Sequence, residues 1–235
     1  MKTGNAFFKI MLCGMLILFF EALVAQNVFH HAQAETSIPL SVQMGYEIQV
    51  KNVGFAAHFG LVPKKWAEFS LDLQSAQDPS VQQRNAFIKS GLTNGSTFDV
   101  AIKYYLKPNP NSFYISILSQ FPTFNVDATL GDYLKNLGIN SGAIGDKALV
   151  QTSFRMILVG ITVGKRFKIT QNLAFQAELG ASYNAEQNPS VPIKTTTLLQ
   201  ENLKNIIQSK MEAAIAESQK SSVLPTLKMG LNYTF

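Results

Sequence analysis

The chain has 235 residues, of which 15% are charged and 11% are aromatic, with 17 phenylalanines among them. Soluble globular proteins carry roughly 25% charged residues, so this composition suits a protein that presents apolar side chains to something other than water. The formal net charge is +5, but the only adjacent basic pairs are Lys64–Lys65 and Lys165–Arg166. Nucleic-acid binding needs a concentrated basic patch, and we therefore expect no nucleic-acid partner.

The N-terminus has the pattern of a secretory signal peptide. Lys2 and Lys9 precede an apolar run from Ile10 to Phe20, and small residues follow. Glu21 ends the apolar run before it reaches the length of a membrane-spanning helix. The pattern therefore predicts a cleaved signal and secretion.

The small residues Ala32-Gln33-Ala34 offer a cleavage site. We predict a signal peptide over residues 1–34 and a mature domain over residues 35–235, with cleavage after Ala25 as the alternative. The only cysteine, Cys13, lies within the signal, so the mature chain has no thiol for disulfides, catalysis or metal binding.

After residue 34 no apolar run is long enough for a spanning helix, which leaves a closed β-barrel as the only way to cross a bilayer. Apolar and polar residues instead alternate with a period of two, which is typical of strands with one apolar face. This alternation predicts eight strands, at residues 42–51, 53–61, 67–74, 97–106, 113–121, 154–167, 173–183 and 227–235.

When the C-terminus is taken as periplasmic, the predicted short connections fall mostly on the periplasmic side and the long ones on the opposite side. Residues 62–65, 108–112 and 168–172 then form short periplasmic turns. The opposite connections are residues 51–52, 75–96, 122–153 and 184–223, and three of these four are long. Short turns on one side and long loops on the other are typical of membrane barrels.

The last long loop contains a helical pattern over residues 196–218. Its apolar residues recur at helical spacing. We expect this helix either to pack against neighbouring loops or to form an amphipathic lid over the barrel mouth. The apolar positions are Leu199, Leu203, Ile206, Ile207 and Met211.

The signal, the alternating strands, the loop asymmetry and the terminal aromatic residue together resemble the small outer-membrane barrel superfamily, with OmpA-type transmembrane domains and OmpW-like barrels as the nearest types. The resemblance implies an all-β fold, an eight-stranded antiparallel up-and-down transmembrane β-barrel, in the outer membrane of a Gram-negative bacterium. It also implies two partners, outer-membrane lipid and the barrel-assembly machinery, which reads the C-terminal strand. In this chain the corresponding strand residues are Leu227, Met229, Leu231, Tyr233 and Phe235.

The polar half of the alternation predicts a charged interior, because the apolar half faces lipid. Both signs of charge occur, so most charges have a partner available. The predicted interior residues are Glu47, Lys51, His58, Glu68, Asp72, Asp99, Lys103, Glu178 and Lys228.

The sequence favours a non-enzymatic barrel with a structural, surface-interaction or narrow-pore role, and we predict no cofactor, metal or catalytic site. One alternative is a lipid-modifying barrel enzyme that uses His58 with Ser70 or Asp72. A second is a soluble periplasmic barrel that binds a small ligand. Inward Leu118, Met156 and Leu158 also leave open a passage for a small hydrophobic ligand.

Overall fold

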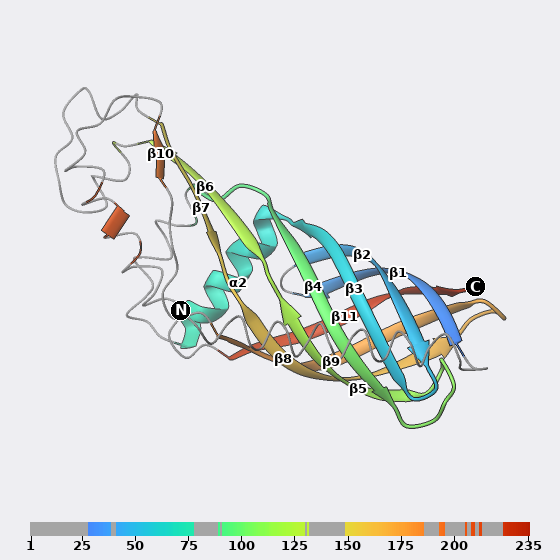
Figure 1. The fold of residues 1–235 in the computed structure, drawn as a ribbon. Coiled ribbons are helices and arrows are strands. Elements are labelled where there is room, and N and C mark those ends of the chain that lie inside the picture. Colours follow the sequence, from blue (N-terminus) through green and yellow to red (C-terminus); the bar gives the residue numbers. More distant parts are fainter. Residues whose placement is uncertain are drawn as a thin grey trace, which may run out of the picture.

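Eight antiparallel strands form a closed ring in the computed structural model, each paired with a neighbour on both sides (Figure 1). The ring closes where the first strand pairs with the last, so the sheet has no open edge at this point. The ring strands are β1 (Val28–Ile38), β2 (Ser41–Val50), β3 (Val53–Val62), β4 (Gly95–Tyr105), β5 (Phe113–Gln120), β8 (Leu158–Lys168), β9 (Leu173–Asn184) and β11 (Val223–Thr234).

The structure describes residues 28–38, 41–77, 89, 91–129, 131, 149–185, 193–195, 205, 208, 209, 212 and 223–235. Among these residues, no helix is both long enough and apolar enough to span a membrane. The predicted helix at residues 196–218 lies almost wholly outside the described part, and so do all five of its apolar positions. That helix stays a prediction.

The predicted alternation holds along the ring strands. On β3, for example, Phe59 and Leu61 are exposed, whereas Ala56, His58 and Val62 are buried. Successive side chains of a strand point to opposite faces of the sheet, so each ring strand gives one set of side chains to the interior and the other to the outside.

Backbone contacts place three short turns and the C-terminus at one end of the barrel (Figure 1). The turn at residues 51–52 lies beside the turn at residues 106–112, because the Tyr105 amide donates to the Asn52 carbonyl at 2.7 Å. The turn at residues 169–172 lies beside the C-terminal strand, because the Thr234 amide donates to the Asn172 carbonyl at 2.8 Å. The long connections all leave from the other end.

This arrangement confirms the predicted sides of the turns near residues 108–112 and 168–172. It corrects the other two short connections, since residues 51–52 lie at the C-terminal end and residues 62–65 lie at the opposite one. The prediction was wrong there because it included a strand at 67–74. Counted back from the C-terminus, this extra strand reverses the direction of the two strands before it, whereas the omission of β1 only kept the total at eight.

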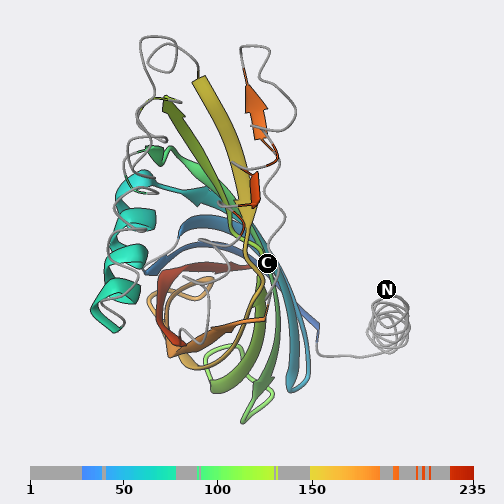
Figure 2. The same cartoon turned by 90° about the vertical axis from the view of Figure 1, so that its left-hand side faces the viewer.

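The predicted strand at residues 67–74 is a helix, α2 (Lys64–Gln77), which runs beside the barrel (Figure 2) at the end opposite the C-terminus (Figure 1). The helix directly follows Pro63, whose carbonyl accepts hydrogen bonds from the amides of Trp66 at 3.0 Å and Ala67 at 3.1 Å. Proline favours the start of a helix because its missing N–H has no partner there. Ala67 is buried, whereas Phe69 is exposed.

The barrel begins at Val28, so the predicted domain boundary between residues 34 and 35 falls inside β1. This strand pairs over most of its length with β2 and with β11, for example Ala34 with Met44 and with Leu231. The small residues that suggested a cleavage site are therefore part of the barrel wall. Cleavage of a signal peptide itself stays a prediction.

A separate hairpin extends the sheet beyond the barrel mouth. It consists of β6 (Thr123–Thr129) and β7 (Leu149–Arg155), with β10 (Ile193–Thr195) paired to β7 (Figure 1). The rings of Phe124 and Phe154 stack across it, with centroids 5.1 Å apart. The predicted strand at 154–167 therefore combines the end of β7 with β8, and the predicted loop at 122–153 contains most of this hairpin.

Candidate functional site: the interior polar network

Polar side chains line the interior of the barrel, and glycines opposite them make room. A Cβ added to Gly45 would lie 2.0 Å from Cδ2 of His58, and one added to Gly164 would lie 2.5 Å from Cζ of Tyr114. Contacts this short cannot exist, so a larger residue at either position would displace a ring. Small residues on one strand thus allow large ones from the next to cross the narrow interior of an eight-stranded barrel.

Glu47 on β2 is the centre of the first part of the network. Its Oε2 lies 2.5 Å from Nη2 of Arg166 on β8 and 3.0 Å from Nζ of Lys103 on β4. Tyr105 donates its hydroxyl to Oε1 at 2.5 Å, and Gln33 donates its Nε2 to Oε2 at 2.8 Å. One carboxylate therefore joins four strands.

Glu178 on β9 is the second carboxylate around Lys103, whose Nζ lies 3.2 Å from its Oε1. Oε1 also accepts hydrogen bonds from the hydroxyl of Tyr114 at 2.7 Å and from Nε2 of Gln176 at 2.8 Å. Oε2 accepts one from the hydroxyl of Thr162 at 2.9 Å. Lys103 thus bridges two carboxylates whose strands, β2 and β9, lie on nearly opposite sides of the ring.

Lys228 on β11 is the centre of the second part of the network. Its Nζ lies 3.1 Å from Oε1 of Glu35 on β1 and 3.3 Å from Oδ2 of Asp99 on β4. Gln43 and Gln120 each donate their Nε2 to the same Oδ2 at 2.8 Å. The lysine again links two carboxylates across the barrel.

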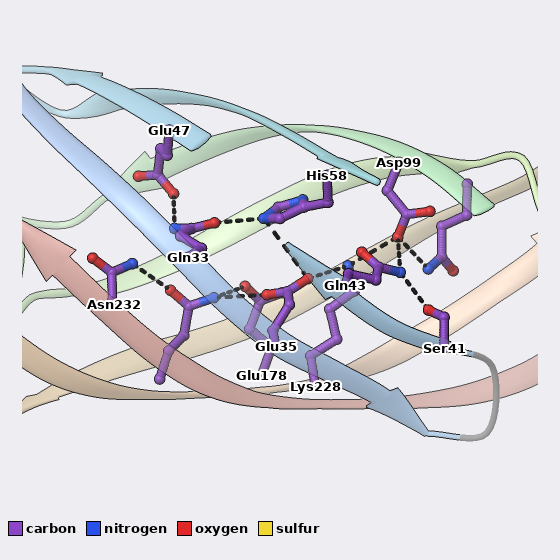
Figure 3. A network of polar contacts seen from close by, with 12 residues as sticks. Gln33, Glu35, Ser41, Gln43, Glu47, His58, Asp99, Glu178, Lys228 and Asn232 are labelled. Carbon is purple, nitrogen blue, oxygen red and sulfur yellow. Dashed lines mark hydrogen bonds and ion pairs between the residues drawn. The ribbon is translucent and has the colours of Figure 1, made fainter. Parts of the chain in front are cut away.

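Two glutamines join the two parts into one network, and Figure 3 shows the first of them, Gln33, between Glu47 and His58. Gln33 donates to Glu47, while its Oε1 lies 2.5 Å from Nε2 of His58. The same Nε2 is 3.8 Å from Oε1 of Glu35. Gln176 donates to Glu178 and also, at 3.4 Å, to Glu35. The polar interior is therefore continuous along the barrel.

The charged members of this network are almost completely shielded from water, since none is more than 5% exposed. Each has an opposite charge within 3.3 Å. Such pairing is what allows ionised groups to stay buried, because an unpaired buried charge costs several kcal/mol. The network has four carboxylates and three cations, which are Glu35, Glu47, Asp99 and Glu178 with Lys103, Arg166 and Lys228.

Six of the nine predicted interior residues lie in this network, and they are Glu47, His58, Asp99, Lys103, Glu178 and Lys228. The other three were wrong. Lys51 is exposed in the turn between β2 and β3, with a positive φ of 52°. Glu68 and Asp72 lie on α2, where they pair with Lys64 at 3.8 Å and Lys89 at 2.6 Å. Both errors on α2 follow from its assignment as a strand.

The sequence prediction missed Glu35 and Arg166, which hold the two parts of the network. Glu35 falls at the predicted start of the mature chain, in a segment that was not assigned to a strand. Arg166 was predictable, because it continues the polar face of β8 after Thr162 and Gly164. His31 was missed for the same reason as Glu35, and its Nε2 lies 3.2 Å from Nη1 of Arg166.

In the part of the chain that the structure describes, His58 makes its polar contacts with an amide and a carboxylate, and the two nucleophile and acid candidates are not among them. Its contacts are with Gln33 and Glu35, and both Ser70 and Asp72 belong to α2 rather than to an adjacent strand. The Ser/His/acid site considered from the sequence is therefore wrong. Within the described residues, no group of three or more His, Cys, Asp or Glu side chains is arranged to hold a metal ion.

The predicted inward residues Leu118, Met156 and Leu158 are buried to 5% exposure or less. Leu118 packs with Ala56 and Ala101 in an apolar cluster. The burial of Leu118 on β5 and Leu158 on β8 confirms their predicted inward direction, whereas Met156 is buried between β7 and β8, outside the ring strands. The three buried side chains therefore give no support to a passage for a hydrophobic ligand.

The outside of the barrel carries an outer apolar belt, in which large apolar side chains are exposed on every ring strand except β1. Met44 is 74% exposed and Leu179 is 66% exposed. A soluble ligand-binding barrel needs the opposite distribution, with an apolar interior and a polar exterior, so the structure does not fit that alternative. The belt consists of Met44, Phe59, Phe98, Ile102, Ile115, Ile117, Ile161, Val163, Leu179, Leu227 and Leu231.

The C-terminal strand β11 contributes to this belt and closes the barrel. Leu227, Leu231, Tyr233 and Phe235 face outward, as the alternation predicts, while Lys228 faces the interior network. β11 pairs with β9 on one side and with β1 on the other. One face of β11 thus belongs to the outer apolar belt, and the other contributes to the interior polar network.

Together these features define a class: a closed eight-stranded antiparallel barrel with an ion-paired interior and an apolar exterior. No family model matches the chain, and no curated protein matches it.

Among solved structures, the chain is similar to a major outer membrane protein of Thermus thermophilus, with a TM-score of 0.49 and 10% identity over 88% of this chain and 99% of that one. It is also similar to the N-terminal β-barrel domain of Pseudomonas aeruginosa OprF, with a TM-score of 0.40 and 11% identity over 89% and 98%. For Acinetobacter baumannii CarO the TM-score is 0.38 and the identity 19%, over 88% and 97%. Because all three scores lie below 0.5, the fold rests on the strand pairings described above.

Proposed function

We propose that this protein is an integral outer-membrane barrel whose interior is closed by the ion-paired network, with a structural and surface-presenting role rather than an enzymatic one. The observation that carries the proposal is the outer apolar belt around a ring with no open edge. A closed barrel satisfies every backbone hydrogen bond between strands, which lipid requires. Outward apolar and inward polar residues are the distribution expected of a transmembrane barrel.

The proposed orientation places the C-terminal end in the periplasm and the long connections outside the cell. The lengths of the connections support it, because outer-membrane barrels have short periplasmic turns and longer outer loops. The hairpin β6–β7 and helix α2 would then stand at the cell surface, where they can meet partners. β11 would be the segment that the barrel-assembly machinery recognises.

Membrane insertion is tested by extraction and gel mobility. The protein is expected to stay with the outer-membrane fraction after a urea wash and to migrate differently in gels before and after boiling. Release by urea together with a single gel mobility would overturn the proposal.

Orientation is tested with single-cysteine variants, because the only native cysteine is Cys13. Lys65→Cys on α2 and Asn109→Cys in the turn at 106–112 are both exposed positions. In intact cells an impermeant maleimide should label the first variant, and it should label the second only after permeabilisation. The reverse labelling would contradict the orientation.

The closed interior supports a structural role over a narrow pore, since the side chains that would border a pore are bonded to each other. Planar-bilayer recordings of the purified protein are expected to lack conductance steps. Reproducible steps would instead favour the narrow-pore role, because opening would require the contacts of Glu47 and Lys228 to break.

The non-enzymatic role is tested at His58, the residue on which the enzyme alternative depends. Cells that carry His58→Ala are expected to keep the lipid A and phospholipid profiles of the wild type. A profile that changes in this variant, while the barrel stays folded by gel mobility, would restore the enzyme alternative.

A further inference from the structure

The exposed charged side chains at the C-terminal end of the barrel are all lysines, and they lie at the same end as the terminal carboxylate of Phe235. We define the C-terminal rim as the turns at 51–52, 106–112 and 169–172 with the strand ends beside them. Among the described residues of this rim, the charged side chains that are exposed or partly exposed are Lys51, Lys107, Lys165 and Lys168, and no Asp or Glu side chain there is exposed.

The opposite end differs, because its exposed charges are mixed. There Lys64 pairs with Glu68, and Lys89 pairs with Asp72. By contrast, the strand carboxylate Glu47, near the C-terminal end of β2, is fully buried and already held by Arg166 and Lys103. The rim lysines therefore have their charge available to a partner.

Aromatic side chains accompany the lysines where the apolar belt ends. The ammonium group of Lys165 lies 4.5 Å from the ring centroid of Phe113 and 5.2 Å from that of Phe167. Tyr104 and Tyr233 are exposed at the same level. Aromatic rings gather where a membrane meets water, and a lysine beside them keeps its stem in apolar surroundings and its charge in the polar layer.

We propose that the C-terminal rim binds the phosphate groups of anionic phospholipids in the leaflet that surrounds it, an inference that rests on the membrane placement proposed above. The lysines stand just beyond the belt, which is the level of the phosphates when the belt fills the hydrocarbon layer. Lysine binds phosphate as a point charge, without the fixed two-bond geometry of arginine.

This arrangement predicts selection by charge rather than by the shape of the headgroup. Lys51 and Lys107 lie in two different turns, and Lys165 and Lys168 lie near the end of β8. Phosphatidylglycerol should therefore bind more tightly than phosphatidylcholine, and added salt should reduce the difference.

The test compares two charge-matched variants of the full chain by native mass spectrometry in neutral detergent with added phosphatidylglycerol or phosphatidylcholine. The rim variant carries Lys51→Gln, Lys107→Gln, Lys165→Gln and Lys168→Gln. The control variant carries Lys64→Gln, Lys65→Gln, Lys89→Gln and Arg155→Gln at the other end, and it removes the same number of positive charges. The folded state of each is checked by heat-modified gel mobility.

The rim variant is expected to bind phosphatidylglycerol roughly tenfold more weakly or worse, with phosphatidylcholine binding unchanged, while the control variant behaves as the wild type. A double variant, Lys107→Gln in the turn at 106–112 with Lys168→Gln at the end of β8, should show an intermediate loss. It provides the test if the fourfold variant fails to fold.

Equal binding of the two lipids by the wild type would overturn the inference, and so would an equal loss in rim and control variants. Rim-dependent sedimentation with isolated murein, without lipid preference, would also overturn it and point to the cell wall. The two proposals fail separately: a protein that urea washes from vesicles refutes membrane insertion, whereas an inserted protein without lipid preference refutes only the rim.

Discussion

Replacing Glu47 with Gln removes the charge at the centre of the network with almost no change in volume. The wild-type carboxylate is fully buried and contacts two cations, Arg166 at 2.5 Å and Lys103 at 3.0 Å. Lys103 keeps a second carboxylate in Glu178, at 3.2 Å. The remaining polar contacts of Arg166 are Gln176 and His31, so its charge is left without an anion.

The expected cost follows from that unpaired guanidinium. Removing one partner of a buried ion pair destabilises a protein by about 3–5 kcal/mol. Since about 1.4 kcal/mol corresponds to a factor of ten, the unfolding equilibrium constant should rise by roughly a hundredfold to a few thousandfold. Glu68→Gln is the matched control, because the pair of Glu68 with Lys64 is partly exposed and longer, at 3.8 Å. Its loss should cost less than about 1 kcal/mol.

The assay is reversible urea unfolding of the chain in lipid vesicles, read from the fraction of folded protein by gel mobility. A double variant, Glu47→Gln with Arg166→Gln, should lose less stability than the two single variants added together, because no cation is then orphaned. If Glu47→Gln costs no more than Glu68→Gln, the ion pairs contribute little to the stability of the barrel and the reasoning fails.

Three further outcomes are expected. In the same unfolding assay, Leu179→Arg in the outer apolar belt should cost about 2–4 kcal/mol, and an unchanged midpoint would place this residue outside lipid. Gly60→Ala should lower the free energy of unfolding by about 1–3 kcal/mol, because its Cβ would lie 2.2 Å from the Val42 carbonyl oxygen. A variant as stable as the wild type would mean that the backbone moves to accommodate the methyl group. N-terminal sequencing of the protein from membranes should start at Gln26, after Ala25, whereas a start at Glu35 would contradict the role of β1.

The alternation of the sequence predicted most of the ring, because one physical rule governs it. Each wall position faces either the belt or the network, and a residue on the wrong side costs several kcal/mol. Seven of the predicted segments accordingly overlap ring strands, and the inward directions of Asp99, Lys103 and Lys228 were correct. The partners of those charges were not predictable, since a pairing such as Glu47 with Arg166 joins strands that are far apart in the sequence.

The segment around α2 shows where alternation is ambiguous. Ala67, Phe69 and Leu71 occupy every second position, which fits a strand, but a helix also accepts these residues when one side is partly exposed. Two signals favoured the helix, namely Pro63 before it and the spacing of Lys64 and Glu68, which are one helical turn apart. A strand here would also have lacked neighbours, because β3 and β4 already pair directly.

The strand β1 was not predicted because signal-peptide cleavage and a barrel wall both accept small residues at the same positions. A signal peptidase needs small residues such as Ala32 and Ala34 before the cut, and an outward barrel position also accepts alanine. The intervening residues separate the two explanations. Gln33 bonds to Glu47 and lies beside His58, and Glu35 pairs with Lys228. Cleavage after Ala34 would remove the first of these bonds, delete most of β1 and open the ring along β2 and β11. The structure therefore favours cleavage before Val28, and of the two candidate sites only the one after Ala25 leaves the barrel intact.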